Sequence, residues 1–380
     1  MYDIFIIGGG INGAGIARDA AGRKLKVILI DKDIVGSATS SWSTKLIHGG
    51  LRYLENYDFR LVRESLKERD IIFNIARDIV KPLPFIIPHS NNLRPAWMIK
   101  LGLFLYDRIG GKTKLPRSSS FNLKQKYPKI LEDNYIKAFK YYDLQVDDKE
   151  LTKLNVKDAI KQGATIKEKT TISAIKRLQN KWVITLNNKE IIESKILINA
   201  TGPWINEVNK NLLNNNQYRK IRLVKGSHLI FNKLYDEEIA FTFQNKDKRI
   251  VFAIPYKNDF TLVGTTEHEV SDPNNLRIEN FEINYLIDCI NLFFNKKINE
   301  SMIVDSFRGI RPLIENFRNS TSSLSRDYLY DLNYSNNQAC LVNIYGGKIT
   351  TYRKLSENVV NSLKVFFPKI KNNWTSKYNL

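Results

Sequence analysis

The first thirty residues combine two short apolar runs with a helical pattern between them. Ile4–Ile7 is an apolar run typical of a buried strand, and Ile11 to about Gly22 places small and apolar side chains at helical spacing. Val27–Ile30 is a second apolar run, and it ends at Asp31. Strand, helix and strand in this order predict a βαβ unit of the length used for dinucleotide binding.

Helical and extended patterns alternate further along the chain. Arg60 to about Ile79 carries apolar side chains at helical spacing with charges between them, which predicts an amphipathic helix. Prolines between residues 82 and 95 then divide the chain into extended pieces, as expected where it leaves a nucleotide-binding domain. A second helical pattern, from near Asp147 to about Gln162, leads the chain back to that domain.

The second half of the chain is dominated by strand patterns. Trp182–Leu186 and Glu190–Glu193 flank two asparagines, which is typical of a hairpin. Lys195–Asn199 follows as a further buried strand. Between about residues 213 and 299 apolar and polar positions alternate in several runs, which predicts an antiparallel sheet that binds the substrate.

The length and composition are those of a globular protein with two joined domains. The chain has 380 residues, of which 43% are hydrophobic and 11% aromatic, enough to form cores of that size. The N-terminus enters an apolar run directly, without a basic region or cleavage site, and Pro95–Tyr106 is too short to cross a bilayer. We therefore expect a cytoplasmic protein without a spanning helix.

Charge and metal-ligand patterns narrow the chemistry only slightly. Cys289 and Cys340 form no CxxC pair, the histidines show no HExxH spacing, and Glu267-His268-Glu269 is interpreted as a charged turn after a strand. We therefore expect no metal. The net charge of +20 has two explanations: a compositional bias, or an anionic partner such as a phosphorylated substrate, an acidic lipid or nucleic acid.

The turn between the first strand and the first helix has the spacing of a dinucleotide site. Gly8, Gly10 and Gly13 satisfy G-x-G-x-x-G, in which glycines allow a tight turn, close approach to a pyrophosphate and close helix packing. The helix N-terminus offers free N–H groups to phosphates, and Asp31 is placed to accept hydrogen bonds from ribose hydroxyls. An ordinary glycine-rich turn is the competing interpretation, and the order of strand, helix, strand and acid argues against it.

Two later segments favour FAD over NAD. Asn199–Gly202 closes a strand with a glycine at which backbone can approach a cofactor, and Gly346–Thr351 opens the last amphipathic helix. A helix that begins at a flavin stabilises negative charge at the N1/O2 edge. Taken alone, the second segment is an ordinary turn before a helix.

Several motifs, in order along nearly the whole chain, resemble one family. They are Ile7–Gly15, Thr39–Glu55, Leu93–Met98, Asn199–Trp204, Val224–His228, Arg308–Pro312 and Gly346–Arg353. Together they are similar to the aerobic FAD-dependent glycerol-3-phosphate dehydrogenases. The resemblance implies an α/β fold in which a glutathione-reductase-like, Rossmann-type FAD-binding domain is interleaved with a substrate-binding domain built on a mixed or antiparallel sheet.

The resemblance also implies a division of the chain into domains. We expect the FAD-binding domain to comprise residues 1–80, 142–212 and 300–365, and the substrate-binding domain to comprise residues 81–141 and 213–299. Members of the family usually continue as a helical C-terminal domain. This sequence stops at Leu380, so we expect that domain to be absent, which leaves its contribution to association or membrane contact open.

The implied reaction is the oxidation of sn-glycerol 3-phosphate to dihydroxyacetone phosphate, with hydride transfer from C2 to flavin N5 and electrons passed to a quinone. The resemblance further implies peripheral attachment to the inner face of the cytoplasmic membrane. The amphipathic stretch Leu93–Ile109 suits an anionic bilayer, although Trp97, Met98 and Leu103 are equally compatible with packing in the substrate domain. The electron acceptor and the oligomeric state, including a homodimer, stay open.

By resemblance, the substrate phosphate is bound by cations beside glycine or proline turns, because Arg binds two phosphate oxygens at once. The candidates are Arg52, Arg311, Arg326 and Lys348, of which Lys348 is also a candidate catalytic residue. His228 and His48 are the candidate bases for the C2 hydroxyl, with His228 expected at the substrate and His48 at the flavin. The cofactor-binding candidates are Gly8, Gly10, Gly13, Asp31, Ser40, Ser41, Lys45, Leu46, His48, Gly202, Gly347 and Thr350.

Three other functions compete with this interpretation. A glycerol-3-phosphate oxidase shares the motifs and passes electrons to oxygen. An RNA-modifying flavoprotein would explain the charge, but no basic and aromatic RNA-binding module occurs in the sequence. A non-catalytic FAD-binding protein is disfavoured because the phosphate and base positions are all filled. We therefore expect FAD, glycerol 3-phosphate, a quinone and an anionic membrane surface as partners, and no nucleic acid.

Overall fold

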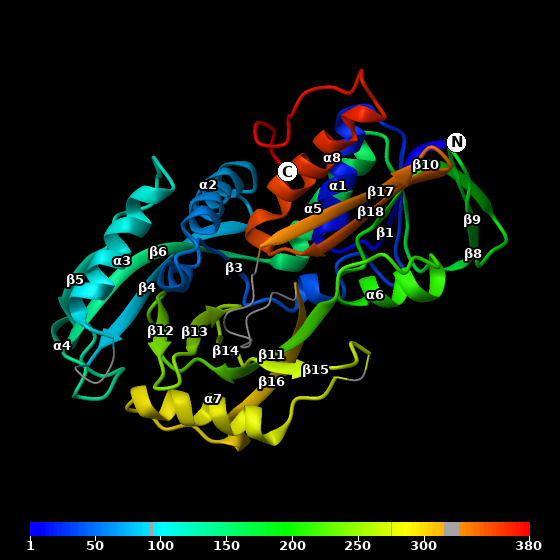
Figure 1. Ribbon diagram of the computed structural model, residues 1–380. Coiled ribbons are helices and arrows are strands. Elements are labelled where there is room, and N and C mark those ends of the chain that lie inside the picture. The colour runs from blue at the N-terminus through cyan, green and yellow to red at the C-terminus, as the bar shows by residue number, and fades with distance from the viewer. Residues whose placement is uncertain (91–93, 275, 315–326) are drawn as a thin grey trace.

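The apolar runs near the N-terminus form neighbouring parallel strands in the middle of a sheet. The structure, a computed structural model, describes residues 1–90, 94–274, 276–314 and 327–380 (Figure 1). β1 (Tyr2–Ile7) pairs in parallel with β2 (Val27–Ile30) on one side and with β10 (Ile191–Asn199) on the other. Both strands of the predicted βαβ unit are buried, as expected for parallel strands that are covered on both faces.

This first sheet is mixed. Its strands run in the order β17 (Tyr328–Ser335), β18 (Gln338–Gly346), β10, β1, β2 and β7 (Thr165–Lys167), and β9 (Trp182–Leu186) joins β10 to β8 (Ile172–Arg177). The predicted hairpin strand and the predicted strand Lys195–Asn199 are one continuous strand, β10. Its first half pairs antiparallel with β9 and its second half pairs in parallel with β1 and β18, so the expectation of two separate strands was wrong.

Three helices cover one face of the first sheet. They are α1 (Ile11–Gly22), α5 (Asp148–Lys161) and α8 (Tyr352–Ser362), seen together in Figure 1. The predicted helix Ile11–Gly22 is confirmed, and its alanines let α1 approach the sheet and its neighbours closely, since all of them are fully buried. Asp147 accepts a hydrogen bond from the Glu150 amide and thereby caps α5. The β8–β9 hairpin packs Trp182 against the opposite face.

The second sheet is largely antiparallel. Its strands run in the order β15 (His268–Val270), β11 (Ile221–Asn232), β14 (Phe260–Gly264), β13 (Ile250–Tyr256), β12 (Ala240–Gln244), β4 (Val80–His89), β6 (Lys137–Val146) and β3 (Leu46–Ile47), with β16 (Ile303–Ile314) on β11 and β5 (Ser119–Asn122) on β6. The antiparallel sheet predicted between residues 213 and 299 is confirmed in β11–β14. The prolines of β4 occupy alternate positions, 82, 84 and 88, so their nitrogens share one orientation and β4 stays paired with β6 along its length.

Helices cover both faces of the second sheet. α7 (Asn280–Phe293), which the sequence pattern did not predict, packs on one face against the phenylalanines of β12. α2 (Phe59–Ile75) and α3 (Ala96–Ile109) contribute to the core on the other face, and α4 (Leu123–Lys126) and α6 (Ile205–Glu207) are short. None of the helices in the described ranges has the length and apolar character needed to span a bilayer.

The sheet boundaries differ from the expected domain division at β3, β6 and β16. β3 lies within residues 1–80, and β6 crosses from residues 81–141 into 142–212, yet both belong to the second sheet. β16 lies within residues 300–365, expected in the FAD-binding domain, but it pairs along its length with β11 of the second sheet. Residues 315–326, including the candidate phosphate-binding residue Arg326, lie outside the described residues. The domain bounds themselves stay a proposal.

A buried ion-pair cluster joins α2 to α8. Arg353 donates to both oxygens of Glu68, at 2.7 and 2.6 Å, and to Glu357 at 2.7 Å. All three side chains are at most 7% exposed. A buried carboxylate without a counter-charge is costly, so Arg353 holds α2 against α8, the helix that covers the first sheet.

We expect Arg353→Met to lower the free energy of unfolding by about 3–5 kcal/mol, because it leaves the buried carboxylate of Glu68 without its counter-charge, whereas Glu357 keeps its pair with Lys354. The matched control is Arg60→Met, since Arg60 pairs with Asp327 while 75% exposed and should lose only about 0–1 kcal/mol. Urea unfolding of both variants measures the difference. Equal losses would contradict the importance of the buried cluster.

Candidate active site

One large cavity connects the glycine-rich turn of the first sheet with the second sheet. Its volume is about 1150 Å³, and its wall includes Gly8, Gly10 and Asn12 at one end and Arg52 and Arg311 at the other. The carboxyl ends of parallel strands are the usual position for ligands in such sheets. The described residues contain no group of three or more His, Cys, Asp or Glu side chains that could hold a metal ion.

The glycine-rich turn is shaped by contacts that exclude side chains. Gly8 has φ +103°, and a Cβ atom there would lie 2.6 Å from the carbonyl oxygen of Ala200. A Cβ atom on Gly13 would lie 1.9 Å from the carbonyl oxygen of Gly8. Gly13 therefore brings α1 against β1, as its place in the motif predicts, and it does not itself line the cavity.

The surroundings of the turn fit a dinucleotide with hydroxyl groups. Asp31 accepts hydrogen bonds from the amides of Gly9, at 2.6 Å, and Asp33, at 2.8 Å, at the cavity wall. Burial raises the pKa of Asp31, and these two hydrogen bonds oppose the rise. Asn12 Oδ1 is buried and has no hydrogen-bond partner among the described residues. It lies in the first turn of α1, where a ligand hydroxyl could donate to it while amides meet the phosphates.

Most of the predicted cofactor-binding residues line this cavity. They are Gly8, Gly10, Asp31, Ser40, Leu46, His48, Gly202, Gly347 and Thr350. Ser41 and Lys45 are not part of the wall. The Ser41 hydroxyl donates to the carbonyl of Gly36, and Lys45 Nζ pairs with Asp148 at 2.7 Å. The side chains of Ser41 and Lys45 therefore hold the loop that precedes His48 instead of lining the cavity.

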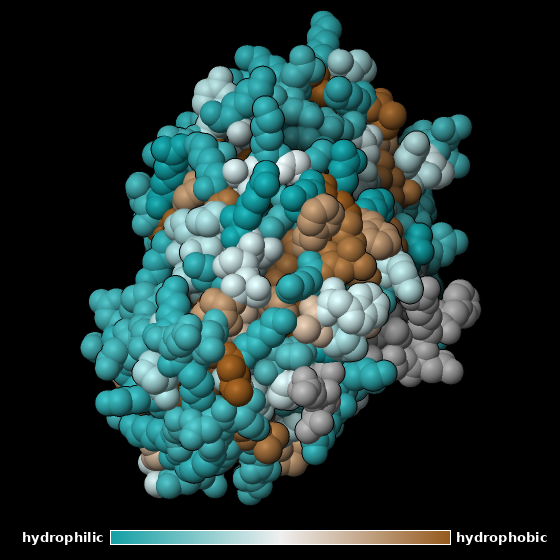
Figure 2. Space-filling model, turned by 90° about the vertical axis from the view of Figure 1, so that its left-hand side faces the viewer, coloured by the Kyte–Doolittle hydropathy of each residue, from teal (hydrophilic) through white to brown (hydrophobic). Residues whose placement is uncertain are grey.

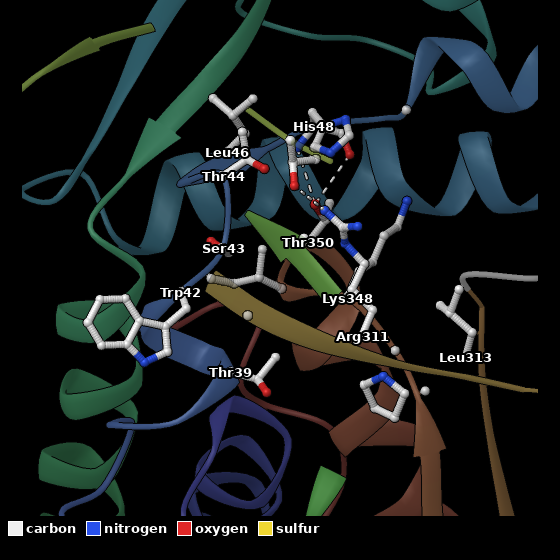
Figure 3. A pocket seen from close by; sticks show the side chains of 18 of the residues that line it. Thr39, Trp42, Ser43, Thr44, Leu46, His48, Arg311, Leu313, Lys348 and Thr350 are labelled. Carbon is white, nitrogen blue, oxygen red and sulfur yellow. Dashed lines mark hydrogen bonds between the residues drawn. The ribbon is translucent and has the colours of Figure 1, made fainter. Parts of the chain in front are cut away.

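Cations from three distant segments meet at the other end of the cavity. Arg311 comes from β16, Lys348 follows β18, and Figure 3 shows both beside His48 and Thr350. Thr350 Oγ1 lies 3.2 Å from both the amide and the carbonyl of His48. Arg52, in the short helix after His48, also lines the wall and lies 4.0 Å from Glu267. The concentration of positive charge favours an anionic ligand.

Gly226 makes room for the Arg311 side chain. A Cβ atom at this position would lie 2.8 Å from Nη2 of Arg311 and 2.5 Å from the hydroxyl of Thr265. Arg311 Nη2 donates to that same hydroxyl at 3.2 Å. The glycine in the Val224–His228 motif thus lets β11 pass beneath the guanidinium, and this is a structural reason for the motif.

His228 does not reach the cavity. The side chain is 1% exposed, stacks on Phe307 with ring centroids 4.6 Å apart, and lies against Gly264. Its Nε2 is 3.0 Å from the hydroxyl of Thr44, which does line the cavity. Burial, helped by the charges of Arg311 and Lys45, holds the pKa of His228 well below 6.5. The expectation that His228 faces the substrate is therefore corrected: it supports the wall from behind.

The sequence interpretation missed Glu267, which lines the cavity instead of belonging only to a charged turn. The alternation of side chains in the segment after β14 could have indicated this position. Thr265 and Glu267 face the cavity, while Thr266 between them turns away and donates to Glu282 at 2.7 Å. A period of two places alternate side chains on one face, so a carboxylate two residues after Thr265 could have been proposed as a wall residue.

We expect His228→Gln to reduce the loss of stability in acid. Because the folded pKa of His228 is lowered, stability is complete above about pH 6.5 and falls as the unfolded chain takes up a proton that the folded protein cannot. One such proton changes the free energy of unfolding by at most about 1.4 kcal/mol per pH unit. Urea unfolding between pH 6.5 and 5 should show a smaller slope in the variant, with His268→Gln at an exposed position as control. An unchanged slope would contradict the buried neutral imidazole.

Comparison with known proteins identifies the family. The family model described as FAD dependent oxidoreductase matches residues 3–353. A D-erythritol 1-phosphate dehydrogenase of Brucella abortus is 44% identical, with 98% of this chain and 76% of that protein covered. A glycerol-3-phosphate dehydrogenase of Pseudomonas aeruginosa is 43% identical, with coverage of 99% and 74%.

Solved structures show the same architecture. The glycerol-3-phosphate dehydrogenase of Bacillus halodurans, solved in complex with FAD, superposes with a TM-score of 0.74 at 25% identity, over 99% of this chain and 67% of that one. The superposition extends over nearly all of this chain, including both sheets described above, and the expected α/β fold is confirmed. The chain therefore belongs to the FAD-dependent oxidoreductase family, and FAD is its cofactor.

Proposed function

We propose that the protein oxidises glycerol 3-phosphate to dihydroxyacetone phosphate. The observation that carries the proposal is that one cavity joins the glycine-rich turn to a group of cations suited to a phosphate dianion. FAD, when bound, supplies the hydride acceptor at flavin N5. The relatives named as glycerol-3-phosphate dehydrogenases support the choice of a three-carbon phosphate.

The residues at the cationic end have distinct roles in this proposal. Arg311 and Lys348 bind the phosphate oxygens, and Arg52 adds a third positive charge. Arg311 donates a hydrogen bond to Thr265, so its guanidinium group is oriented before the ligand binds. Lys348 Nζ lies 4.8 Å from the centre of the Tyr53 ring, which fixes the direction of the amine.

His48 is our candidate for the proton acceptor. Oxidation of the C2 hydroxyl requires a group that takes the hydroxyl proton while the hydride leaves C2. His48 lines the cavity and its backbone is fixed by Thr350, whereas His228 is buried behind Thr44. Geometry therefore favours His48, which reverses the preference drawn from the sequence.

A second candidate substrate is a four-carbon polyol phosphate. The relative from Brucella abortus, named D-erythritol 1-phosphate dehydrogenase, is as similar to this chain as the glycerol-3-phosphate dehydrogenases are. The phosphate cradle would be shared, and the cavity would have to accept one more hydroxymethylene group. Comparison of kcat/KM for the two phosphates decides between them.

We expect anaerobic addition of glycerol 3-phosphate to bleach the visible flavin absorption of the purified, FAD-loaded protein. Arg311→Ala should retain FAD but lose roughly 2–4 kcal/mol of transition-state binding, about 30- to 1000-fold in kcat/KM. Arg308→Ala is the matched control, because Arg308 is exposed on the same strand and donates to the carbonyl of Leu276. Absence of bleaching in the unmodified protein would overturn the proposed function, and near-parental kcat/KM in Arg311→Ala would overturn the phosphate cradle.

We further propose that α3 binds an anionic membrane and that a quinone accepts the electrons. Trp97, Met98, Leu101 and Phe104 of α3 are 40–66% exposed, while Leu103 and Tyr106 are buried in the core. Figure 2 shows apolar side chains gathered on the face that carries α3. Part of this patch also lines the cavity, so an apolar acceptor could pass from the bilayer towards the flavin without crossing water.

We expect the protein to sediment with anionic vesicles at low and at high salt, because apolar insertion is not screened by ions. Replacing both Leu101 and Phe104 by Ser should weaken binding at high salt about tenfold or more. Ile191→Ser, at an apolar position that is 66% exposed on the other sheet, is the control. Binding that high salt abolishes would leave only electrostatic adhesion, and no binding at low salt would contradict the membrane proposal and favour oxygen as acceptor.

A further inference from the structure

Glu267 places a negative charge in the cationic end of the cavity. Its side chain is 8% exposed and lines the wall between β14 and β15. The backbone alternation that turns Thr266 into the core, where it bonds to Glu282, directs Thr265 and Glu267 to the cavity. The carboxylate is thus built into the site by the strand geometry.

The position of Glu267 relative to the cations is unusual for a phosphate site. Its Oε1 lies 4.0 Å from Nη1 of Arg52, and Thr265, two residues earlier, accepts a hydrogen bond from Arg311. A carboxylate repels a phosphate dianion and any other anion bound nearby. The part of the substrate that meets Glu267 is therefore not its phosphate.

The chemistry of a carboxylate suits the opposite end of a polyol phosphate. An ionised carboxyl group has about four acceptor positions, so Glu267 can accept from a ligand hydroxyl while it stays near Arg52. Hydroxyl groups donate, whereas a carboxylate on the ligand cannot donate and is repelled. Recognition by a buried acceptor discriminates strongly against ligands that lack the donor.

We propose that Glu267 is a specificity-determining residue for the substrate's hydroxyl end. It accepts a hydrogen bond from the hydroxyl group farthest from the phosphate, and it excludes phosphorylated compounds that carry a carboxylate at that end. The inference rests on the proposed function, because it assumes that Arg311 and Lys348 bind the phosphate oxygens.

A simpler role is that Glu267 only holds Arg52 in place. The two roles differ in their effect on anions. If Glu267 only positions Arg52, its replacement weakens the binding of all phosphorylated ligands, and of inorganic phosphate, by a similar factor. If Glu267 accepts a hydrogen bond from the hydroxyl end, its replacement weakens the binding of the polyol phosphate. The same replacement strengthens the binding of a ligand that carries a carboxylate in that place.

The test uses Glu267→Gln in the FAD-loaded protein and three ligands. Inorganic phosphate probes the cradle alone, and 3-phosphoglycerate carries a carboxylate where glycerol 3-phosphate carries a hydroxymethyl group. Dissociation constants for phosphate and 3-phosphoglycerate come from changes in the flavin absorption spectrum, and kcat/KM is measured for glycerol 3-phosphate. Glu269→Gln is the matched control, because Glu269 is exposed and pairs with Arg222 outside the cavity wall.

We expect Glu267→Gln to bind 3-phosphoglycerate about tenfold or more tightly than the parent and to lose about tenfold or more in kcat/KM for glycerol 3-phosphate. Phosphate affinity should change by less than about threefold, and towards tighter binding, since only the repulsion is removed. An equal change for phosphate and 3-phosphoglycerate, or weaker binding of both, overturns the inference.

The binding comparison separates this inference from the proposed function. If glycerol 3-phosphate fails to bleach the flavin of the parent protein, the proposed reaction is wrong, while the ratio of the phosphate and 3-phosphoglycerate constants still tests Glu267. If the parent is bleached and the ratio does not change in Glu267→Gln, only the inference about Glu267 fails.

Discussion

The site depends on a backbone contact that only glycine permits. Gly13 in α1 rests against the carbonyl oxygen of Gly8, and Gly8 in turn rests against Ala200 at the end of β10. Any side chain at these positions would push α1 away from the sheet. With the contact made, the N-terminus of α1 and the carboxyl ends of β1, β2, β10 and β18 converge on one cavity, which is the position where open α/β sheets bind ligands.

The second sheet supplies the other half of the site through its long strands. β11 and β16 pair along their length, and this pairing carries Arg311 and Gly226 to the far end of the cavity. Thr265 and Glu267 lie between the neighbouring strands β14 and β15. Groups held by strands keep their geometry better than groups on loops, which is what a site that orients a small phosphate needs.

A buried polar network holds the loop that carries His48 in place through the neighbouring residue Gly49. The Gly49 amide donates to Tyr106 at 2.7 Å, Tyr106 donates to Asp143, and Asp143 pairs with Arg69 at 2.9 Å. His228 supports the same wall through Thr44. Buried ion pairs of this kind contribute little net stability, but removing one partner is strongly destabilising. The network therefore fixes the geometry of the site and makes it sensitive to mutation.

The sequence by itself determined the local elements of this protein. The glycine spacing, the apolar runs around it and the helix Ile11–Gly22 follow from short-range sterics and periodicity, and the structure has them where they were predicted. Resemblance of motifs added Arg52, Arg311, Lys348 and His48, all of which line the cavity. α7 escaped detection because its apolar pattern stood within a region dominated by strand alternation.

Only the tertiary structure decided which polar side chains meet and which are buried. His228 and Glu267 are both polar residues beside strand ends in the sequence, yet one is packed between Phe307 and Gly264 and the other lines the cavity. Lys45 looked suited to a cofactor and is instead paired with Asp148, more than a hundred positions away in the chain. Such outcomes depend on the register of strands that are distant in sequence, because a shift of one residue exchanges the two faces of a strand, and no local pattern records that register.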